Sequence, residues 1–198
     1  MTLAPAPETP RLGMSMDDFI RRTAQEGNFE ILDEELVHRM PTISTHSKLI
    51  KRFLRLFLPF EDANLGEVYS ETTFVLEDTS DWVRGARIPD VMWVGREKLD
   101  AFYGVTPHAD SKPFVLVPDI VIEVVSPNDK YSDITNKVSL YVRDGVRLVW
   151  VVDFDAQTVV VHAAEQPPQI LRGAQSLTAG EILPDFSVTI AELFTPTT

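Results

Sequence analysis

The sequence predicts an α/β (α+β) fold in which a mixed central β-sheet is flanked by helices, preceded by an N-terminal helix and a hairpin. Two observations carry this prediction. Segments typical of helices and strands follow one another in the order helix, three strands, helix, strand. One strand-like segment, residues 118–126, reads Pro-Asp-Ile-Val-Ile-Glu-Val-Val-Ser. It is apolar at most positions, as expected of a central strand covered on both faces.

The predicted helices begin at a capping residue or after a turn, and they end at glycine or proline. They cover residues 15–27, 44–58 and 130–144, with Ser15 as the first cap and with Gly27, Pro59 and Gly145 as the stops. The predicted strands are rich in β-branched and aromatic residues. They cover residues 29–32, 35–40, 67–76, 88–94, 119–125, 146–152 and 158–163. A hairpin loop is expected around residues 78–84, and a long surface loop at 104–113.

The composition is that of one globular domain. Residues 14–198 are long enough to bury a sizeable core, whereas residues 1–13 are rich in proline and are expected to be flexible. Hydrophobic residues make up 44% and charged residues 24% of the chain, which are ordinary values for a soluble protein. No apolar run reaches the roughly 18 residues of a membrane span, and the N-terminus lacks the pattern of a secretory signal. We therefore expect a cytoplasmic protein without membrane association.

Charge and cysteine content restrict the chemistry. The chain has no cysteine, which excludes disulfides and cysteine-based zinc sites. Its formal net charge of −12 argues against a polyanionic partner, because nonspecific affinity for nucleic acid comes largely from Lys and Arg. Carboxylates around a bound metal are neutralised locally, however, and basic residues can be concentrated on one face. The charge weighs against nucleic acid without excluding it.

Two carboxylates stand where core residues are expected. Glu123 lies in the middle of the apolar strand 119–125, and Asp90 lies in the apolar segment Ile88-Pro-Asp-Val-Met-Trp-Val94. The period of two in a strand places Asp90 on the same face as Met92. A buried carboxylate needs a cation, a hydrogen-bond partner or a raised pKa. Two of them on one sheet can supply the oxygen ligands that Mg²⁺ or Mn²⁺ prefers.

A structural alternative exists for both carboxylates, because each can pair with an arginine such as Arg87 or Arg147. Lys137 adds a third element to the metal-site interpretation, since it falls on the apolar stripe of the helix 130–144. An ammonium group aimed at the sheet can stabilise negative charge that builds up on a phosphate. The alternative for Lys137 is an ion pair with Asp133, one turn earlier on the same helix.

These motifs, in this order, resemble the Uma2 family (formerly DUF820), a member of the PD-(D/E)XK restriction-endonuclease-like superfamily. The resemblance covers roughly residues 14–194. It rests on residues 89–90 and 118–127, on Lys137 and Tyr141, and on residues 145–153. It extends to residues 29–37, His46 and residues 183–186.

The resemblance implies a restriction-endonuclease-like core in which Asp90 and Glu123 bind Mg²⁺ or Mn²⁺. The superfamily's usual lysine lies two residues after that glutamate, where this chain has Val125. Lys137 on the following helix is then the natural replacement. The implied activity is the hydrolysis of phosphodiester bonds in nucleic acid, expected to be DNA.

Two further site residues follow from the resemblance. Glu35 matches the acidic residue of the family's Gly-Glu-Leu hairpin, although Glu34 replaces the glycine here. His46 matches a recurring histidine at the mouth of the site, where it can bind metal or carry a proton. A helix-capping or packing role for His46 is an equal alternative.

A basic stripe on the helix 44–58 offers a route for a phosphate backbone. It consists of Lys48, Lys51, Arg52 and Arg55. A solvated amphipathic helix has the same pattern, so the stripe makes nucleic-acid binding compatible with the acidic net charge without requiring it.

Two other classes of function remain open. The chain can be a catalytically silent nuclease-fold protein that binds nucleic acid or a protein partner, an interpretation that Val125 favours. It can also be a scaffold whose acids are structural. A homodimer is a further expectation, because nucleases that cut both strands commonly act as dimers. Trp82, Trp93 and Phe102 fit either such an interface or the core.

Overall fold

The computed structural model describes residues 14–38, 44–79, 82–126 and 129–195, so the prediction for residues 1–13 falls outside the described chain. The helices are α1 (Met16–Glu26), α2 (Ser44–Asp62), α3 (Arg96–Val105), α4 (Tyr131–Asp144) and α5 (Ile190–Phe194), with a 3₁₀ turn at Ala109–Ser111. None of the helices in the described part of the chain is long and apolar enough to cross a membrane.

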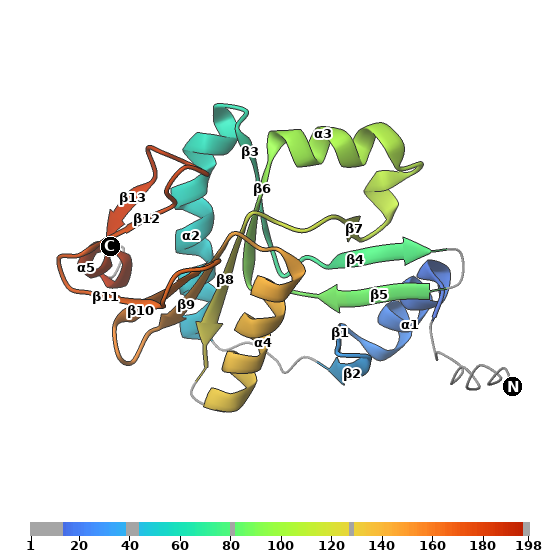
Figure 1. Ribbon diagram of the computed structural model, residues 1–198, viewed down its shortest axis with the longest axis horizontal. Helices are drawn as coiled ribbons and strands as arrows, with labels where there is room; N and C mark the ends of the chain where they lie inside the picture. The colour runs from blue at the N-terminus through green and yellow to red at the C-terminus, as the bar shows by residue number, and fades with distance from the viewer. Residues whose placement is uncertain (1–13, 39–43, 80–81, 127–128, 196–198) are drawn as a thin grey trace, which may run out of the picture.

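The larger sheet is the centre of the molecule. Its six strands lie in the order β11 (Gln169–Arg172), β10 (Thr158–Ala163), β9 (Leu148–Asp153), β8 (Ile120–Val125), β6 (Val91–Gly95) and β3 (Gly66–Ser70). The β8–β9 pair is parallel and the other neighbours are antiparallel. Helices α2 and α4 lie on opposite faces of this sheet (Figure 1), which covers β8 on both sides and explains its apolar sequence.

The smaller sheet has the strand order β2 (Glu35–His38), β1 (Phe29–Leu32), β5 (Trp82–Arg87), β4 (Phe74–Thr79) and β7 (Phe114–Val115). Helix α1 packs on it through Met16 and Phe19. The predicted β1–β2 hairpin is confirmed, with positive φ angles of 47° and 69° at Asp33 and Glu34. Positive φ at both central residues is the geometry that matches the twist of a tight hairpin. A two-stranded pair, β12 (Ser176–Thr178) with β13 (Ser187–Thr189), completes the strands of the described residues.

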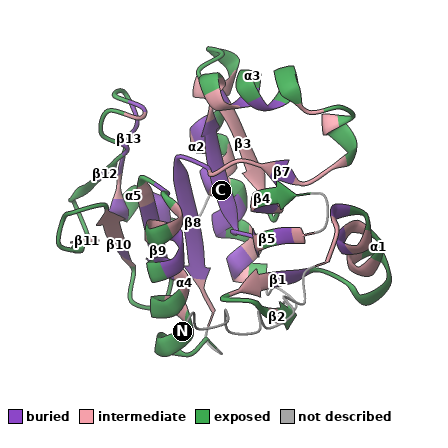
Figure 2. Cartoon of the chain, turned by 45° about the vertical axis from the view of Figure 1, so that its right-hand side comes forward, coloured by how far each residue is buried: buried purple, intermediate pink, exposed green. Residues whose placement is uncertain are grey.

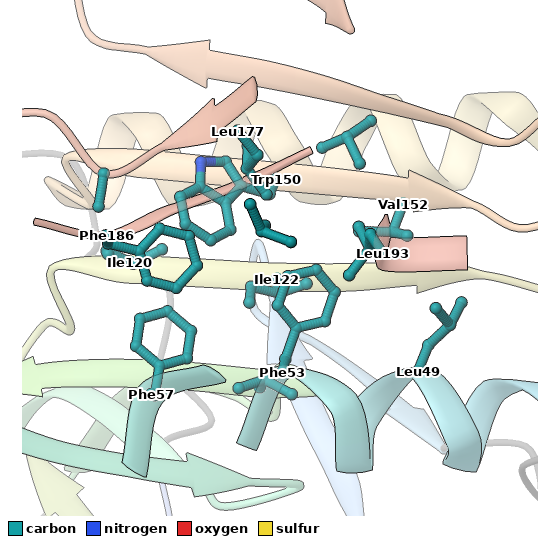
Figure 3. Packing of buried hydrophobic residues seen from close by; sticks show 14 of the residues in the cluster. Leu49, Phe53, Phe57, Ile120, Ile122, Trp150, Val152, Leu177, Phe186 and Leu193 are labelled. Carbon is teal, nitrogen blue, oxygen red and sulfur yellow. The ribbon is translucent and has the colours of Figure 1, made fainter. Parts of the chain in front are cut away.

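Aromatic residues dominate the core between α2 and the larger sheet. The ring centroid of Phe57 lies 5.3 Å from that of Trp93, 6.2 Å from that of Trp150 and 4.9 Å from that of Phe186. Figure 3 shows Leu49, Phe53 and Phe57 of α2 directed at the strand residues Ile120 and Ile122. The buried elements surround β8, whereas α3 and the outer strands carry the exposed surface (Figure 2).

Several predicted boundaries are wrong, and α2 is the first. The helix does not end at Leu58 but continues through Pro59 to Asp62. Pro59 removes one backbone donor, yet its own carbonyl accepts a hydrogen bond from Ala63 (3.1 Å). The ring of Phe60 also packs 5.9 Å from that of Phe186. Packing on both sides of the proline therefore keeps the helix intact.

The predicted strand 67–76 is wrong, because it is two strands in different sheets. Strand β3 ends at Ser70, Glu71 takes a positive φ of 48°, and β4 starts at Phe74 in the smaller sheet. The predicted strand 88–94 is likewise shifted, since β5 ends at Arg87 and β6 starts at Val91. The predicted loop at 78–84 belongs largely to the paired strands β4 and β5.

Helix α3 was not predicted, and it occupies the start of the expected loop at 104–113. It buries only Leu99 and Phe102, so its apolar pattern is weak. The elements β11, β12, β13 and α5 were also not predicted. The helix that ends at Gly145 is confirmed, with Gly145 in the left-handed conformation at φ 99°. Strand β10 has the predicted bounds.

Candidate metal and catalytic site

Ionisable side chains from both sheets and two helices meet at the end of the larger sheet where β8 ends and α2 and α4 begin (Figure 1). They are Glu30 of β1, His46 of α2, Asp90 before β6, Glu123 of β8, and Lys137 and Tyr141 of α4. The sequence predicted His46, Asp90, Glu123 and Lys137 as site residues, and the structure brings these four together with Glu30 and Tyr141.

Glu123 is buried, with 4% of its surface exposed. The hydroxyl of Tyr141 donates a hydrogen bond to Oε1 (2.5 Å), and Nζ of Lys137 lies 3.5 Å from Oε2. Burial raises the pKa of Glu123 to about 7; Lys137 lowers this pKa, and Asp90 and Glu30 raise it. The site therefore holds more negative charge than its one lysine offsets.

Asp90 is also buried, with 1% of its surface exposed. It lies one residue before β6 rather than within a strand, where its Oδ2 accepts a hydrogen bond from the amide of Val124 (2.7 Å). Nε2 of His46 lies 3.1 Å from the Oδ1 atom. The hydrogen bond to Val124 fixes Asp90 beside Glu123, the residue that precedes Val124 on β8.

Lys137 points at the sheet, because its Nζ lies 3.0 Å from Oε2 of Glu30 and 3.5 Å from Oε2 of Glu123. The arginines that were considered as structural partners pair elsewhere. Arg87 lies 2.9 Å from Asp144, and Arg147 lies 3.8 Å from Asp119.

Sequence reasoning missed Glu30. It is 2% exposed, and its Oε1 accepts a hydrogen bond from the amide of Ile88 (3.0 Å). The signal was an acid inside the apolar strand Phe29–Leu32, which is the same signal that singled out Glu123. Glu35, the acid that the resemblance selected from this hairpin, is exposed on β2, and its contacts with the site are not among those found in the described residues.

The basic stripe lies on the outer side of α2. Lys48, Lys51 and Arg55 are exposed, whereas Arg52 donates a hydrogen bond to the carbonyl of Thr195. Residues Leu49, Phe53 and Phe57 on the opposite side of the helix are buried. Three of the four basic residues are thus available to solvent.

The two aromatic residues that were considered for a dimer interface, Trp93 and Phe102, are core residues. They are 1% and 4% exposed, and Phe102 packs 5.2 Å from Phe114, centroid to centroid. Trp82 is partly exposed. Core packing therefore accounts for the first two.

A fit between the site and a divalent cation can be judged from its donors. Among the described residues, no group of three or more His, Cys, Asp or Glu side chains is placed to hold a metal ion. Mg²⁺ commonly takes only one or two carboxylates and completes its shell with water and phosphate oxygens. The two carboxylates Asp90 and Glu123, with the excess negative charge around them, fit that requirement.

Comparison with known proteins agrees with this architecture. The family model of Uma2, described as "Putative restriction endonuclease", matches residues 16–191. The chain belongs to the Uma2 family. A crystal structure described as "a putative nuclease belonging to DUF820", from Anabaena variabilis ATCC 29413, superposes with a TM-score of 0.74 at 16% sequence identity. The match covers 91% of this chain and 97% of that one.

The structural likeness shows that this Uma2 protein has a restriction-endonuclease-like fold. Membership of the family indicates a nuclease, whose substrate is nucleic acid. No match is found among curated proteins.

Proposed function

We propose that this Uma2 protein is a metal-dependent endonuclease that hydrolyses phosphodiester bonds in nucleic acid, with DNA as the expected substrate. The observation that carries the proposal is the pair of buried carboxylates, Asp90 and Glu123, with the ammonium of Lys137 3.5 Å from Glu123. Buried acids surrounded by further acids are costly for a purely structural site. They are suited to a cation.

Asp90 and Glu123 would hold Mg²⁺ or Mn²⁺, which are hard cations that prefer oxygen ligands. When bound, such an ion supplies Lewis acidity at a phosphate and lowers the pKa of a coordinated water. Tyr141 and the amide of Val124 orient the two carboxylates through the hydrogen bonds described above. Their role is to fix the direction of the lone pairs that face the ion.

Lys137 would stabilise the negative charge that develops on the phosphate during hydrolysis. It comes from α4 rather than from the strand that carries Glu123, since Val125 occupies the usual position. His46 lies 3.1 Å from Asp90 and would position that carboxylate or take up a proton at Nε2. Glu35 is exposed at the hairpin, where a contact with the substrate suits it better than a role in the chemistry.

The exposed residues Lys48, Lys51 and Arg55 would follow the phosphate backbone outside the site. The stripe begins two residues after His46 on the same helix, so it starts near the carboxylates. Concentrating positive charge there reconciles binding of a polyanion with the net charge of −12.

The test uses plasmid DNA and structured RNA with Mg²⁺ or Mn²⁺, and compares the wild type with Asp90→Asn and Glu123→Gln. We expect metal-dependent cleavage that both substitutions abolish. The matched control is Asp119→Asn, because Asp119 is also a buried acid and accepts a hydrogen bond from the amide of Gly95 (2.9 Å). It lies at the opposite end of β8. Cleavage that survives both site substitutions contradicts the proposed site.

A second candidate function is that of a catalytically silent nuclease-fold protein that binds nucleic acid or a protein partner, favoured by Val125 in the usual lysine position. Calorimetric titration with Mn²⁺ distinguishes the cases further. Binding of metal and DNA without cleavage supports the silent protein. Absence of Mn²⁺ binding indicates a scaffold whose acids are structural.

A further inference from the structure

Glu30 uses both of its carboxylate oxygens, and each contacts a different half of the site. Its Oε1 accepts a hydrogen bond from the amide of Ile88 at 3.0 Å, and its Oε2 lies 3.0 Å from Nζ of Lys137. Ile88 is two residues before Asp90 in the segment that connects β5 to β6. One buried side chain of the smaller sheet therefore links the catalytic lysine to the segment that carries a metal-binding acid.

The contact with Lys137 is shorter than the contact that Lys137 makes with Glu123, 3.0 Å against 3.5 Å. A lysine side chain is a flexible four-carbon stem with a point charge, so its ammonium needs partners to hold it in one position. The need is greater here because Lys137 reaches the site from a helix rather than from the strand beside the metal-binding acids. Glu30 supplies that partner.

The position of Glu30 is itself secured by contacts between its hairpin and α4. Asp33 of the β1–β2 turn lies 2.7 Å from Arg143 of α4. Arg87 donates a hydrogen bond to the carbonyl of Ile31 and lies 2.9 Å from Asp144 of α4. The hairpin is thus attached to α4 on either side of Glu30 along the chain.

We propose that Glu30 is a positioning residue of the nuclease, which holds the ammonium of Lys137 and the Ile88–Asp90 segment in register with each other. The proposal rests on the function proposed above. Its content is that the smaller sheet is part of the catalytic apparatus. Because both oxygens of Glu30 are engaged by the protein, its task is to place Lys137 rather than to bind the metal ion.

The first test is Glu30→Gln. The amide side chain keeps an oxygen for the amide of Ile88 but presents an uncharged NH₂ group to Lys137, so only the contact with the lysine is lost. We expect kcat to fall on the order of 10- to 100-fold with KM within about twofold, because misplacing a catalytic group by an ångström has effects of that size. Glu30→Asp, which keeps the charge but shortens the side chain, should restore part of the rate.

The matched control is Asp119→Asn. Asp119 has the same two kinds of partner as Glu30, a backbone amide (Gly95, 2.9 Å) and a lysine (Lys98, 2.8 Å), and it is 6% exposed. It lies at the far end of β8. We expect kcat of this variant to remain within about threefold of the wild type. An equal loss in both variants would mean that any buried acid–lysine pair matters only for the fold.

The second test is a double-mutant cycle with Lys137→Met. If Glu30 acts through Lys137, Glu30→Gln changes kcat less than about twofold once the lysine is gone. The same cycle in the thermal unfolding midpoint, together with a crystal structure of Glu30→Gln showing where Nζ lies, needs no nuclease activity. Additive effects on the unfolding midpoint and an unmoved Nζ overturn the positioning role. Absence of cleavage by the wild type overturns only the proposed function.

Discussion

The charge of Glu123 is the costliest in the candidate site. Burial raises its pKa to about 7, and Asp90 and Glu30 act in the same direction, whereas Lys137 and the hydroxyl of Tyr141 lower it. Glu123 therefore binds its proton more tightly in the folded than in the unfolded chain, where the pKa is 4.5. The metal-free protein loses stability as the pH rises from about 4.5 through about 7.

Glu123→Gln should stabilise the metal-free protein at pH 8 by on the order of 2–3 kcal/mol, because the glutamine carries no charge to bury. Thermal unfolding in the presence of a chelator measures this. At pH 5 the wild type is already largely protonated at Glu123, so the two proteins should unfold at similar temperatures there. A stabilisation that is the same at both pH values would contradict the role of the charge.

Binding of Mn²⁺ should depend on pH for the same reason, since the ion must displace the proton of Glu123. We expect the affinity to rise by up to about tenfold per pH unit below about 7 and to level off above it. Calorimetry between pH 5.5 and 8.5 provides the measurement, and proton release in buffers of different ionisation enthalpy provides the control. An affinity that does not vary with pH places the ion away from Glu123.

The site could be predicted from sequence where an acid interrupts an apolar strand. That signal identified Asp90 and Glu123, and it was also present at Glu30. The family hairpin directed attention to Glu35 instead, which lies exposed on the neighbouring strand. The difference arises because a hairpin pattern shows that two strands pair but not which of their faces meets a distant helix.

At the scale of the element, α2 shows how packing overrides a local signal. Its proline would end an isolated helix, yet Phe57 and Phe60 on either side of it pack against Phe186. Similarly, the alternation of residues 67–76 continues through Glu71 although the chain changes sheets there. Periodicity reports which residues are buried, and it does not report which sheet buries them.

Pro59→Ala should therefore stabilise the protein. The alanine restores a backbone donor in the last turns of α2 and relieves the clash of the proline ring with the preceding turn. Because Pro59 is exposed, the substitution loses little packing. We expect a gain of about 1–3 kcal/mol, visible as a rise in the thermal midpoint, with cleavage unaffected. A lower midpoint would show that the proline relieves strain instead.

The basic stripe of α2 gives a second prediction for this helix. Replacing Lys48, Lys51 and Arg55 by glutamine should weaken DNA binding and reduce the salt dependence of log Kd by up to about three phosphate contacts. Fluorescence anisotropy at several salt concentrations provides the measurement. The control replaces Arg21, Arg84 and Arg172, exposed on other elements, and so removes the same charge. Equal losses in both triple variants contradict a localised contact.

At the scale of the whole molecule, the C-terminal segment is part of the core. Phe186 packs with its ring centroid 4.9 Å from that of Phe57 and 5.3 Å from that of Trp150. Phe186→Ala should cost about 3–5 kcal/mol, measured by chemical denaturation. Phe154→Ala is the matched control, since Phe154 is 40% exposed and should cost much less. Similar losses for both would mean that the C-terminal segment contributes little to the core.

The excursion between the two sheets has a consequence for how sequences of this fold can diverge. The chain leaves the larger sheet after Ser70 and returns at Val91, and the amide of Glu71 donates a hydrogen bond to the carbonyl of Asp90 (3.2 Å). The exit and the return are thus closed against each other at the base of the β4–β5 hairpin. Insertions or deletions at the distant tip of this hairpin change its length but not its base. Evolution can reshape that tip, and with it the surface a substrate meets, while Asp90 stays where it is.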